Sequence, residues 1–362
     1  MQTIIQSLMP ATMSQKLNQT CYKYIFPIAL LLFWLPVFSQ NNFTEMDAFL
    51  QQNKKEIGNN YAVLIWKDGK IIYQKQTQDF TAKTQTPVYN AGNWLTAALV
   101  MSFVDDGKIS LDDKVSKYIP IFKTYMKDFI TIRNCLTNTT GIHTEAGALK
   151  LFQKNKFANL EDEVNAFASK REIEANPGTE FYYSNIGPDI AGRVLEIISK
   201  KSFDRLIQEK LLRPLKMRGT NFTNNDGGAI DPSGGAKSSA IDYMNFLTML
   251  INKGSFEGKQ ILSEKSIEEM ETTQFATIPV KYVPEQTKGL HYALGAWIAE
   301  ADADGKATAL SCNDMAGGIS LIDKCRNYAA IILLPSQKPE IIKNFYVNFK
   351  QIIDNKIPSA CK

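Results

Sequence analysis

Residues Asn90–Pro120 read Asn-Ala-Gly-Asn-Trp-Leu-Thr-Ala-Ala-Leu-Val-Met-Ser-Phe-Val-Asp-Asp-Gly-Lys-Ile-Ser-Leu-Asp-Asp-Lys-Val-Ser-Lys-Tyr-Ile-Pro. The apolar run Trp94–Val104 within this stretch is followed by Asp-Asp-Gly, which is typical of a helix that stops at a glycine. Asn90 and Asn93 precede this run and are three residues apart, so both lie on one face of the first turn. Asparagine is favoured at the N-cap, and we expect Asn90 to cap the helix.

Strand-like and helical patterns occupy different parts of the chain. Strands are expected at 61–66, 71–76, 292–298, 307–312, 319–323 and 328–334. Helices are expected at 43–57, 130–136, 159–170, 186–199, 242–252 and 340–353. This order predicts an α+β fold in which one antiparallel sheet is built from both termini and flanked by helices, with an all-helical subdomain. The sheet part covers about 43–89 and 290–358 and the helical part about 90–289.

The N-terminal region has the layout of a secretory signal. Tyr24–Phe38 is an uncharged apolar run with two lysines and no acidic residue upstream, and the small residue Ser39 follows it. The run is shorter than the roughly 20 residues of a membrane-spanning helix. We therefore expect residues 1–39 to be a signal peptide, residues 40–358 to form the folded domain, and the protein to be exported to the periplasm or the extracellular space. An uncleaved anchor is the alternative.

Charge and composition give little sign of a charged partner. The formal net charge is +4 and the basic residues are interspersed with acidic ones, so no nucleic-acid partner is expected. The histidines His143 and His291 lack neighbouring ligands at metal spacing, which predicts neither a metal site nor a cofactor. Four cysteines follow the expected signal, and in an exported chain they allow three full sets of disulfides: Cys135, Cys312, Cys325 and Cys361.

Several segments, in order along the chain, resemble motifs of the serine beta-lactamase and penicillin-binding-protein family. They are the helix start at 90–93 with Leu111-Asp112-Asp113, the Pro-Gly-Thr-Glu-Phe-Tyr-Tyr-Ser-Asn of 177–185, Leu212–Thr220, and Gly234–Asp242. The resemblance runs from about residue 43 to 349. It implies a beta-lactamase/transpeptidase-like fold with a cleft lined by Tyr183 and Asn185, although packing and turn geometry could equally explain why these two residues are present.

The two residues that would perform acyl transfer in this family are replaced. Asn90 stands where the family has its nucleophilic serine, and Asn93 stands where it has lysine. An amide nitrogen has no nucleophilic lone pair at neutral pH and cannot accept a proton, so both roles are lost together.

The family's third cleft motif, a lysine or histidine followed by threonine or serine and then glycine, is also replaced. The chain has Cys312-Asn313-Asp314 at this place, so the cation is missing and a carboxylate replaces glycine. We expect Asp314 to repel ligands that carry a carboxylate. The histidine of another family motif is Asn138 here.

Together these features predict an exported beta-lactamase-related protein that is catalytically inactive and has a binding or scaffolding role. Its ligand would be a small molecule or a cell-wall peptide, and no membrane partner is expected after signal cleavage. The oligomeric state is left open. The alternative is a hydrolase of esters, amides or peptides that uses a non-standard group, such as Tyr183 or Cys312. For Cys312 we rank a buried free thiol first, a disulfide with Cys325 second and a catalytic thiol third.

Overall fold

The computed structural model describes residues 43–144, 157–223, 228–274, 277–312, 318–335 and 342–361. All of them belong to the unit Asn42–Lys362. The expected signal peptide, residues 1–39, lies outside the described residues, and so does the cleft position Asp314. No helix in the described ranges is both long enough and apolar enough to span a bilayer.

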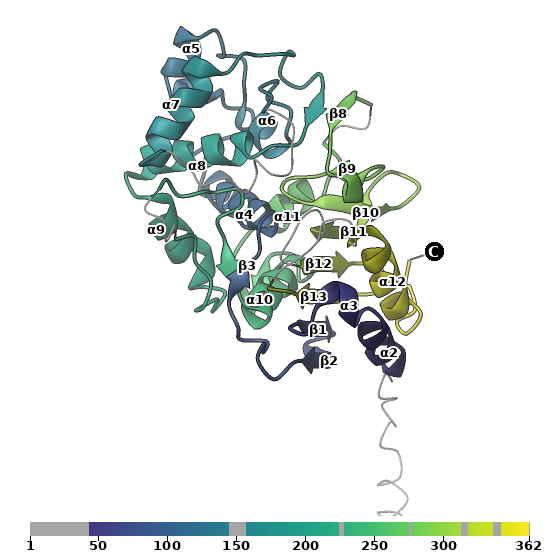
Figure 1. Cartoon of the computed structure of the whole chain (residues 1–362). Helices are drawn as coiled ribbons and strands as arrows, with labels where there is room; N and C mark the ends of the chain where they lie inside the picture. The colour runs from purple at the N-terminus through teal and green to yellow at the C-terminus, as the bar shows by residue number, and fades with distance from the viewer. Residues whose placement is uncertain are drawn as a thin grey trace, which may run out of the picture. The chain divides into compact units, whose positions relative to one another are not determined.

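One sheet joins the two ends of the described chain (Figure 1). Its seven strands have the order β2-β1-β13-β12-β11-β10-β9. The bounds are β1 Ala62–Lys67, β2 Lys70–Gln76, β9 His291–Tyr292, β10 Trp297–Ala301, β11 Ala307–Cys312, β12 Gly318–Asp323 and β13 Tyr328–Leu333. Strand β1 pairs antiparallel with β13, with Ala62 opposite Leu333. The expected α+β class, with one sheet built from both ends of the domain, is confirmed.

The first hairpin forms where the sequence predicts it. Asp68 and Gly69 join β1 to β2, and both have positive φ, at 46° and 87°. A two-residue hairpin turn matches the right-handed twist of its strands when both turn residues have positive φ. Glycine adopts a positive φ without steric penalty.

The prediction of a single strand at residues 292–298 is wrong. Residues 291–292 and 297–301 are separate antiparallel strands, β9 and β10, joined by a tight turn. The N–H of Ala293 donates to the carbonyl of Ala296 at 2.9 Å, and Gly295 has a φ of 82°. This left-handed glycine reverses the chain in the middle of an apolar run, which explains why hydrophobicity alone did not reveal the break.

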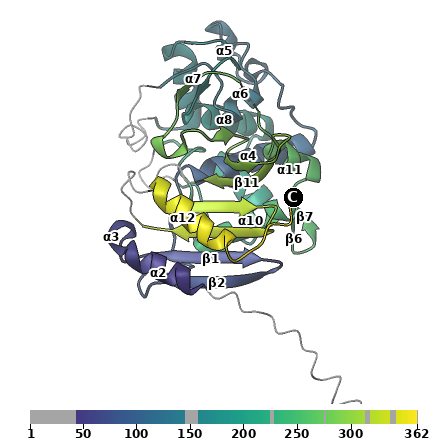
Figure 2. The same ribbon diagram turned by 90° about the vertical axis from the view of Figure 1, so that its right-hand side faces the viewer.

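Helices cover both faces of the sheet (Figures 1 and 2). The terminal helices α2 (Thr44–Gln52), α3 (Lys54–Ile57) and α12 (Ile342–Asp354) share one apolar cluster with inward-facing residues of β1, β12 and β13. Helix α10 (Ala240–Ile251) packs on the same three strands within the second, larger cluster. Strands β1, β12 and β13 are therefore buried on both sides, as their nearly continuous apolar sequences require, whereas the edge strand β2 is largely exposed.

The helical part surrounds α4 (Ala91–Asp105), in which twelve of fifteen residues are buried. A helix that is apolar on all sides is stable only in the interior of a domain. Around it lie α5 (Ile121–Thr124), α6 (Ile132–Leu136), α7 (Leu160–Lys170), α8 (Ile186–Ser199), α9 (Phe203–Ile207) and α11 (Glu264–Met270). Single helical turns are η1 (Val115–Lys117), η2 (Gln208–Leu212) and η3 (Glu285–Thr287). Short strands are β3 (Thr86–Pro87), β4 (Phe181–Tyr182), β5 (Lys237–Ser238), β6 (Ser255–Phe256), β7 (Lys259–Gln260) and β8 (Val280–Tyr282).

Candidate functional site

The start of α4 places Asn90 and Asn93 in the interior, where they are 7% and 2% exposed. Asn90 holds the N-cap position, but its backbone is helical, with φ −62° and ψ −14°, and its side chain makes no capping bond. The expected cap is therefore wrong. The N–H groups of residues 91–93 already donate to the carbonyl oxygens three residues earlier, at 2.7–3.1 Å. Each of these N–H groups is therefore already bonded, and none is available to donate to the Asn90 side chain.

Asn93 is bonded to the retained tyrosine of the cleft. Its amide nitrogen Nδ2 donates to the hydroxyl oxygen of Tyr183 at 3.2 Å. Tyr183 is 2% exposed, and its ring packs against Tyr292 and Trp297 at centroid distances of 5.8 and 5.3 Å. The contact joins the first turn of α4 to a residue 90 positions later in the chain.

Asn138 holds the loop that presents Tyr183. Its backbone is left-handed, with a φ of 56°, a conformation that asparagine tolerates better than most residues. Its side-chain oxygen accepts from the N–H of Ser184, and its carbonyl accepts from the N–H of Tyr182, both at 3.0 Å. Asn138 therefore positions the backbone on both sides of Tyr183.

Gly295 links α4 to the end of β11. A Cβ at this glycine would lie 2.6 Å from the carbonyl oxygen of Asn93, so no other residue fits. The carbonyl of Gly295 accepts a weak bond from the thiol of Cys312 at 3.7 Å. The structure thus brings Cys312, Asn93 and Tyr183 into one site. Gly295 was missed from the sequence, although a lone glycine inside a strand pattern indicates a close backbone approach.

Three amide atoms of this site are buried and have no hydrogen-bond partner among the described residues. They are Nδ2 of Asn90, Oδ1 of Asn93 and Oδ1 of Asn185, the last of which stands at the N-cap position of α8 without capping it. A buried polar atom without a partner destabilises a fold by roughly 1–3 kcal/mol. The group offers a donor and two acceptors but no charge, so its chemistry suits neutral hydrogen bonding and cannot relay a proton.

A small apolar pocket of about 70 Å³ lies beside this site. Its walls are aromatic and aliphatic side chains with a histidine: Phe181, Ile278, Val280, Val283, Leu290, His291, Tyr292 and Trp297. Tyr292 and Trp297 also contact Tyr183, so the pocket and the amide site share one aromatic wall. A volume below the roughly 150 Å³ of a benzene-sized cavity limits it to a small apolar group.

The four cysteines resolve into one disulfide and two thiols. Cys325 and Cys361 are joined, with their sulfur atoms 2.00 Å apart, whereas Cys135 and Cys312 are buried and free. The first-ranked prediction for Cys312, a buried free thiol, is confirmed, and the second-ranked disulfide between Cys312 and Cys325 is wrong.

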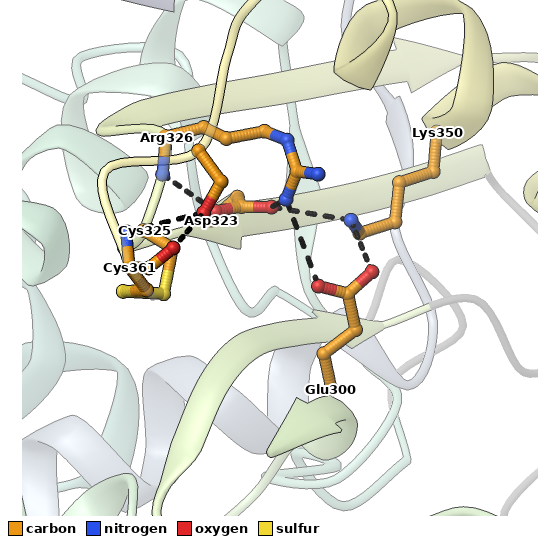
Figure 3. Close-up of a disulfide and its surroundings, with 7 residues drawn as sticks. Glu300, Asp323, Cys325, Arg326, Lys350 and Cys361 are labelled. Carbon is orange, nitrogen blue, oxygen red and sulfur yellow. Dashed lines mark hydrogen bonds and ion pairs between the residues drawn. A yellow bond between two sulfur atoms is a disulfide. The ribbon is translucent and has the colours of Figure 1, made fainter. Parts of the chain in front are cut away.

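A cluster of three carboxylates lies near this disulfide (Figure 3). One oxygen each of Glu300, Asp323 and Asp354 lie within 4.8 Å of one another. The ammonium of Lys350 bonds to these three carboxylates at 2.6, 3.1 and 2.6 Å. Figure 3 shows its contacts with Glu300 and Asp323. Burial lowers the pKa of Lys350, but hydrogen bonds to Asp354 and Glu300 raise it more, so the net shift is upward. A protonated lysine among the ligands does not fit a resident metal ion, and the cluster is an ion-pair network.

His143 contacts two acidic residues that the sequence did not place near it. Its Nδ1 lies 3.1 Å from Glu174, and its Nε2 lies 2.5 Å from Glu180. The two carboxylates lie against different ring nitrogens, so they do not converge on one point with a single imidazole ligand as a mononuclear metal site requires. The ring also stacks on Tyr182 at a centroid distance of 4.1 Å.

Comparison with known proteins gives consistent matches over most of the chain. The family model described as Beta-lactamase matches residues 50–342. Protein flp of Staphylococcus aureus strain MRSA252 is 27% identical over 301 residues, which are 78% of this chain and 58% of that protein. The chain therefore spans little more than half the length of this relative.

Solved structures share the fold. A beta-lactamase homologue from Bacteroides dorei DSM 17855 is 28% identical, with a TM-score of 0.78 over 87% of this chain and 98% of the other. EstCE1, a hydrolase with promiscuous acyltransferase activity, has a TM-score of 0.72 at 18% identity, over 87% of this chain and 99% of the other. At that identity, the second similarity shows the fold alone.

Proposed function

This chain belongs to the beta-lactamase family, and we propose that it is an exported member that forms no acyl-enzyme and acts as a binding or scaffolding protein. Export rests on the apolar N-terminal run that precedes the folded domain. The periplasm or the extracellular space is the compartment that this signal implies.

One contact carries the proposal of inactivity. The Asn93 amide donates to Tyr183 in a site where neither residue is more than 2% exposed. A neutral amide there supplies no base, and Asn90 one turn earlier supplies no nucleophile. Loss of the catalytic groups as a unit leaves only the weak rate enhancement of binding and fixed dipoles.

The same residues favour a neutral ligand. Asn90, Asn93 and Asn185 present uncharged donor and acceptor atoms, and the adjoining pocket takes a small apolar group. Asp314 in the third motif adds a negative charge to the same cleft segment of the sequence. We therefore propose a small molecule or a cell-wall peptide whose recognised group is an amide or a hydroxyl and not a carboxylate.

Acylation of the purified protein tests the proposal. A fluorescent penicillin and a fluorescent fluorophosphonate are incubated with the full chain, and covalent label is measured after denaturing electrophoresis. We expect no label above that of heat-denatured protein. Stoichiometric label on a serine would overturn the proposal.

Ligand charge is tested by thermal shift. Dipeptides with an amidated C-terminus are compared with the same dipeptides as free acids, at equal concentrations. We expect stabilisation by the amides only, because a ligand stabilises the state that binds it. Stabilisation by the free acids alone would contradict the neutral-ligand proposal.

The second candidate is a hydrolase that uses a non-standard group. The thiol of Cys312 is the observation in its favour, because it lies against Gly295 beside Asn93. This candidate predicts turnover of activated esters that disappears in Cys312→Ala or in Tyr183→Phe. If the unmodified chain does not turn over activated esters, the hydrolase candidate is ruled out.

A further inference from the structure

Three exposed apolar side chains are grouped at the end of α5. Met126, Phe129 and Tyr125 are 83%, 66% and 44% exposed. Within the described ranges only four other large apolar side chains are exposed, and they are spread over the chain: Ile71, Ile241, Val280 and Val347. We call Tyr125, Met126 and Phe129 the apolar tip. Clustered exposed apolar side chains mark an interaction site more often than single ones do.

The apolar tip projects from the outer end of the helical part. In both views α5 lies at the end of the helical part away from strands β1 and β2 (Figures 1 and 2). The backbone turns sharply here, because Met126 is left-handed, with a φ of 54°, and the N–H of Lys127 donates to the carbonyl of Phe122 at 2.7 Å. The tip is thus a protruding turn.

Basic residues surround the apolar tip. Residues 114–129 contain four lysines and one acidic residue, Asp128, but Lys127 is buried and Lys117 is paired with Asp113. The ammonium of Lys114 lies 5.5 Å from the ring centroid of Phe129, and that of Lys127 lies 6.0 Å from the ring centroid of Tyr125. Lys114 and Lys123 are exposed, and the described residues give neither an ion pair.

Acidic residues close to the tip offset part of this charge and leave Lys114 and Lys123 exposed. Asp113 is paired with Lys117 at 3.0 Å, and Asp112 is paired with Arg133 at 2.9 Å. Asp128 follows Lys127 in the sequence, and the charge of Glu172 acts to raise the pKa of Lys127, while burial lowers it more. The surface around the tip therefore carries exposed cationic side chains next to apolar ones.

We propose that the apolar tip and its lysines dock on an anionic lipid surface. Aromatic and methionine side chains enter the boundary between headgroups and acyl chains, while Lys114 and Lys123 extend to the phosphate groups. A protruding turn needs no complementary hollow in a lipid surface. Three side chains also cover far less than the roughly 1,200 Å² that a stable protein interface buries, so a protein partner fits less well. This proposal differs from the expectation of no membrane partner after signal cleavage, because local sequence does not reveal that these side chains are exposed.

A fluorescent probe on the tip tests the proposal. Cys135 and Cys312 are buried and Cys325 is bonded to Cys361, so with Cys21→Ser in every protein compared an environment-sensitive thiol dye will label an introduced surface cysteine selectively in the folded full chain. Met126→Cys carries the dye on the tip, and Val347→Cys carries it on α12 as the matched control, since Val347 is 51% exposed. Both proteins have the same N-terminal residues, so any attachment through that region affects them equally.

The expected result is a blue shift of the Met126→Cys probe on vesicles that contain phosphatidylglycerol. The Val347→Cys probe should not shift, and Lys114→Gln with Lys123→Gln should weaken the response of the tip probe about tenfold in lipid concentration. Raising the salt concentration should act in the same direction. No shift, an equal shift at both positions, or an equal shift on uncharged phosphatidylcholine vesicles would overturn the proposal. So would a shift that needs no vesicles and grows with protein concentration, which would indicate self-association.

Discussion

The amide nitrogen of Asn93 lies 3.2 Å from the hydroxyl oxygen of Tyr183, and this hydrogen bond joins α4 to the loop before α8. The position that holds a lysine in the family motif therefore keeps a polar link to the cleft tyrosine without a charge. A neutral pair needs less solvation than a buried ammonium, so the arrangement is compatible with the 2% exposure of both residues.

The first prediction concerns that bond. Tyr183→Phe removes the hydroxyl and leaves the Asn93 amide nitrogen buried without this acceptor. We expect the free energy of unfolding to fall by roughly 1–2 kcal/mol, measured by urea denaturation. Tyr125→Phe, at a side chain that is 44% exposed, is the matched control and should change stability by less than about 0.5 kcal/mol. Equal effects of the two substitutions would show that the bond contributes nothing.

The second prediction concerns restored chemistry. Asn90→Ser combined with Asn93→Lys should gain slow labelling by a fluorescent fluorophosphonate, because nucleophile and base act as a unit. Either single substitution should remain at background and serves as the control. Label on the Asn90→Ser protein alone would show that another group already acts as the base. No label on the double variant, if folded, would place a further block at the third motif.

Most of the fold could be predicted from local patterns. The Asp68-Gly69 turn and the end strands follow from period-2 alternation and turn chemistry, and helix α8 was predicted with its observed bounds, Ile186–Ser199. The break between β9 and β10 could not be read from hydrophobicity, because both arms are apolar. Gly295 was the one local signal of this break. Its close approach to Asn93 is a tertiary contact, which local sequence does not specify.

The sequence suggested residues for a candidate site but not the contacts between them. The sequence indicated Asn93 and Tyr183 separately, and only the fold brings them within 3.2 Å. The prediction that Asn90 caps the helix was wrong because backbone carbonyl oxygens already accept hydrogen bonds from the N–H groups of that turn. The pairing of Cys325 with Cys361 depends on where the C-terminus lies after α12, which local sequence does not specify.

The third prediction concerns pH. Burial, followed by the charges of Asp231 and Glu163, raises the pKa of Asp189 well above its usual range, and a backbone N–H at Ser233 lowers it less. The folded state then holds this proton at a pH where the unfolded chain, with a pKa of about 3.9, has lost it. The contribution of Asp189 to stability therefore falls as the pH rises above that value, until the folded-state pKa is passed.

Asp189→Asn removes this effect, because the amide is neutral at every pH. Relative to the unmodified protein, the variant should gain stability when the pH is raised from 5 to 8. Urea denaturation at both pH values provides the measurement, and Asp79→Asn at an exposed acid is the control. A pH-independent difference between variant and unmodified protein would refute the shift.

The fourth prediction concerns the disulfide. Cys325 and Cys361 are 36 residues apart, and closing a loop of that length stabilises the folded state by about 3–4 kcal/mol in the chain-entropy model. Cys325→Ala with Cys361→Ala should lower the free energy of unfolding by that order, and dithiothreitol should then have no further effect. Cys135→Ala, at a free cysteine, should show no change in its response to dithiothreitol relative to the unmodified protein. If dithiothreitol leaves the unmodified protein as stable as before, the bond does not contribute.

The last prediction concerns Lys350, whose ammonium lies among the carboxylates of Glu300, Asp323 and Asp354. Lys350→Ala leaves three carboxylates whose oxygens lie within 4.8 Å of one another, with Arg326 as the remaining cation beside them. Removing one partner of a buried ion pair destabilises a protein by roughly 3–5 kcal/mol. We expect a large loss of thermal stability in this variant.

Calcium should restore part of that stability, because hard cations bind groups of carboxylate oxygens and the space of the ammonium is then free. The measurement is the melting temperature with calcium chloride, against magnesium chloride and against sodium chloride of equal ionic strength. The unmodified protein should gain nothing from calcium beyond the ionic-strength control, since Lys350 fills the position of the cation. Lys356→Ala, at a cation paired with Glu45 at 3.7 Å on the surface, is the matched control and should neither lose much stability nor respond to calcium. A calcium response in the unmodified protein would mean that the cluster binds a metal in spite of the lysine.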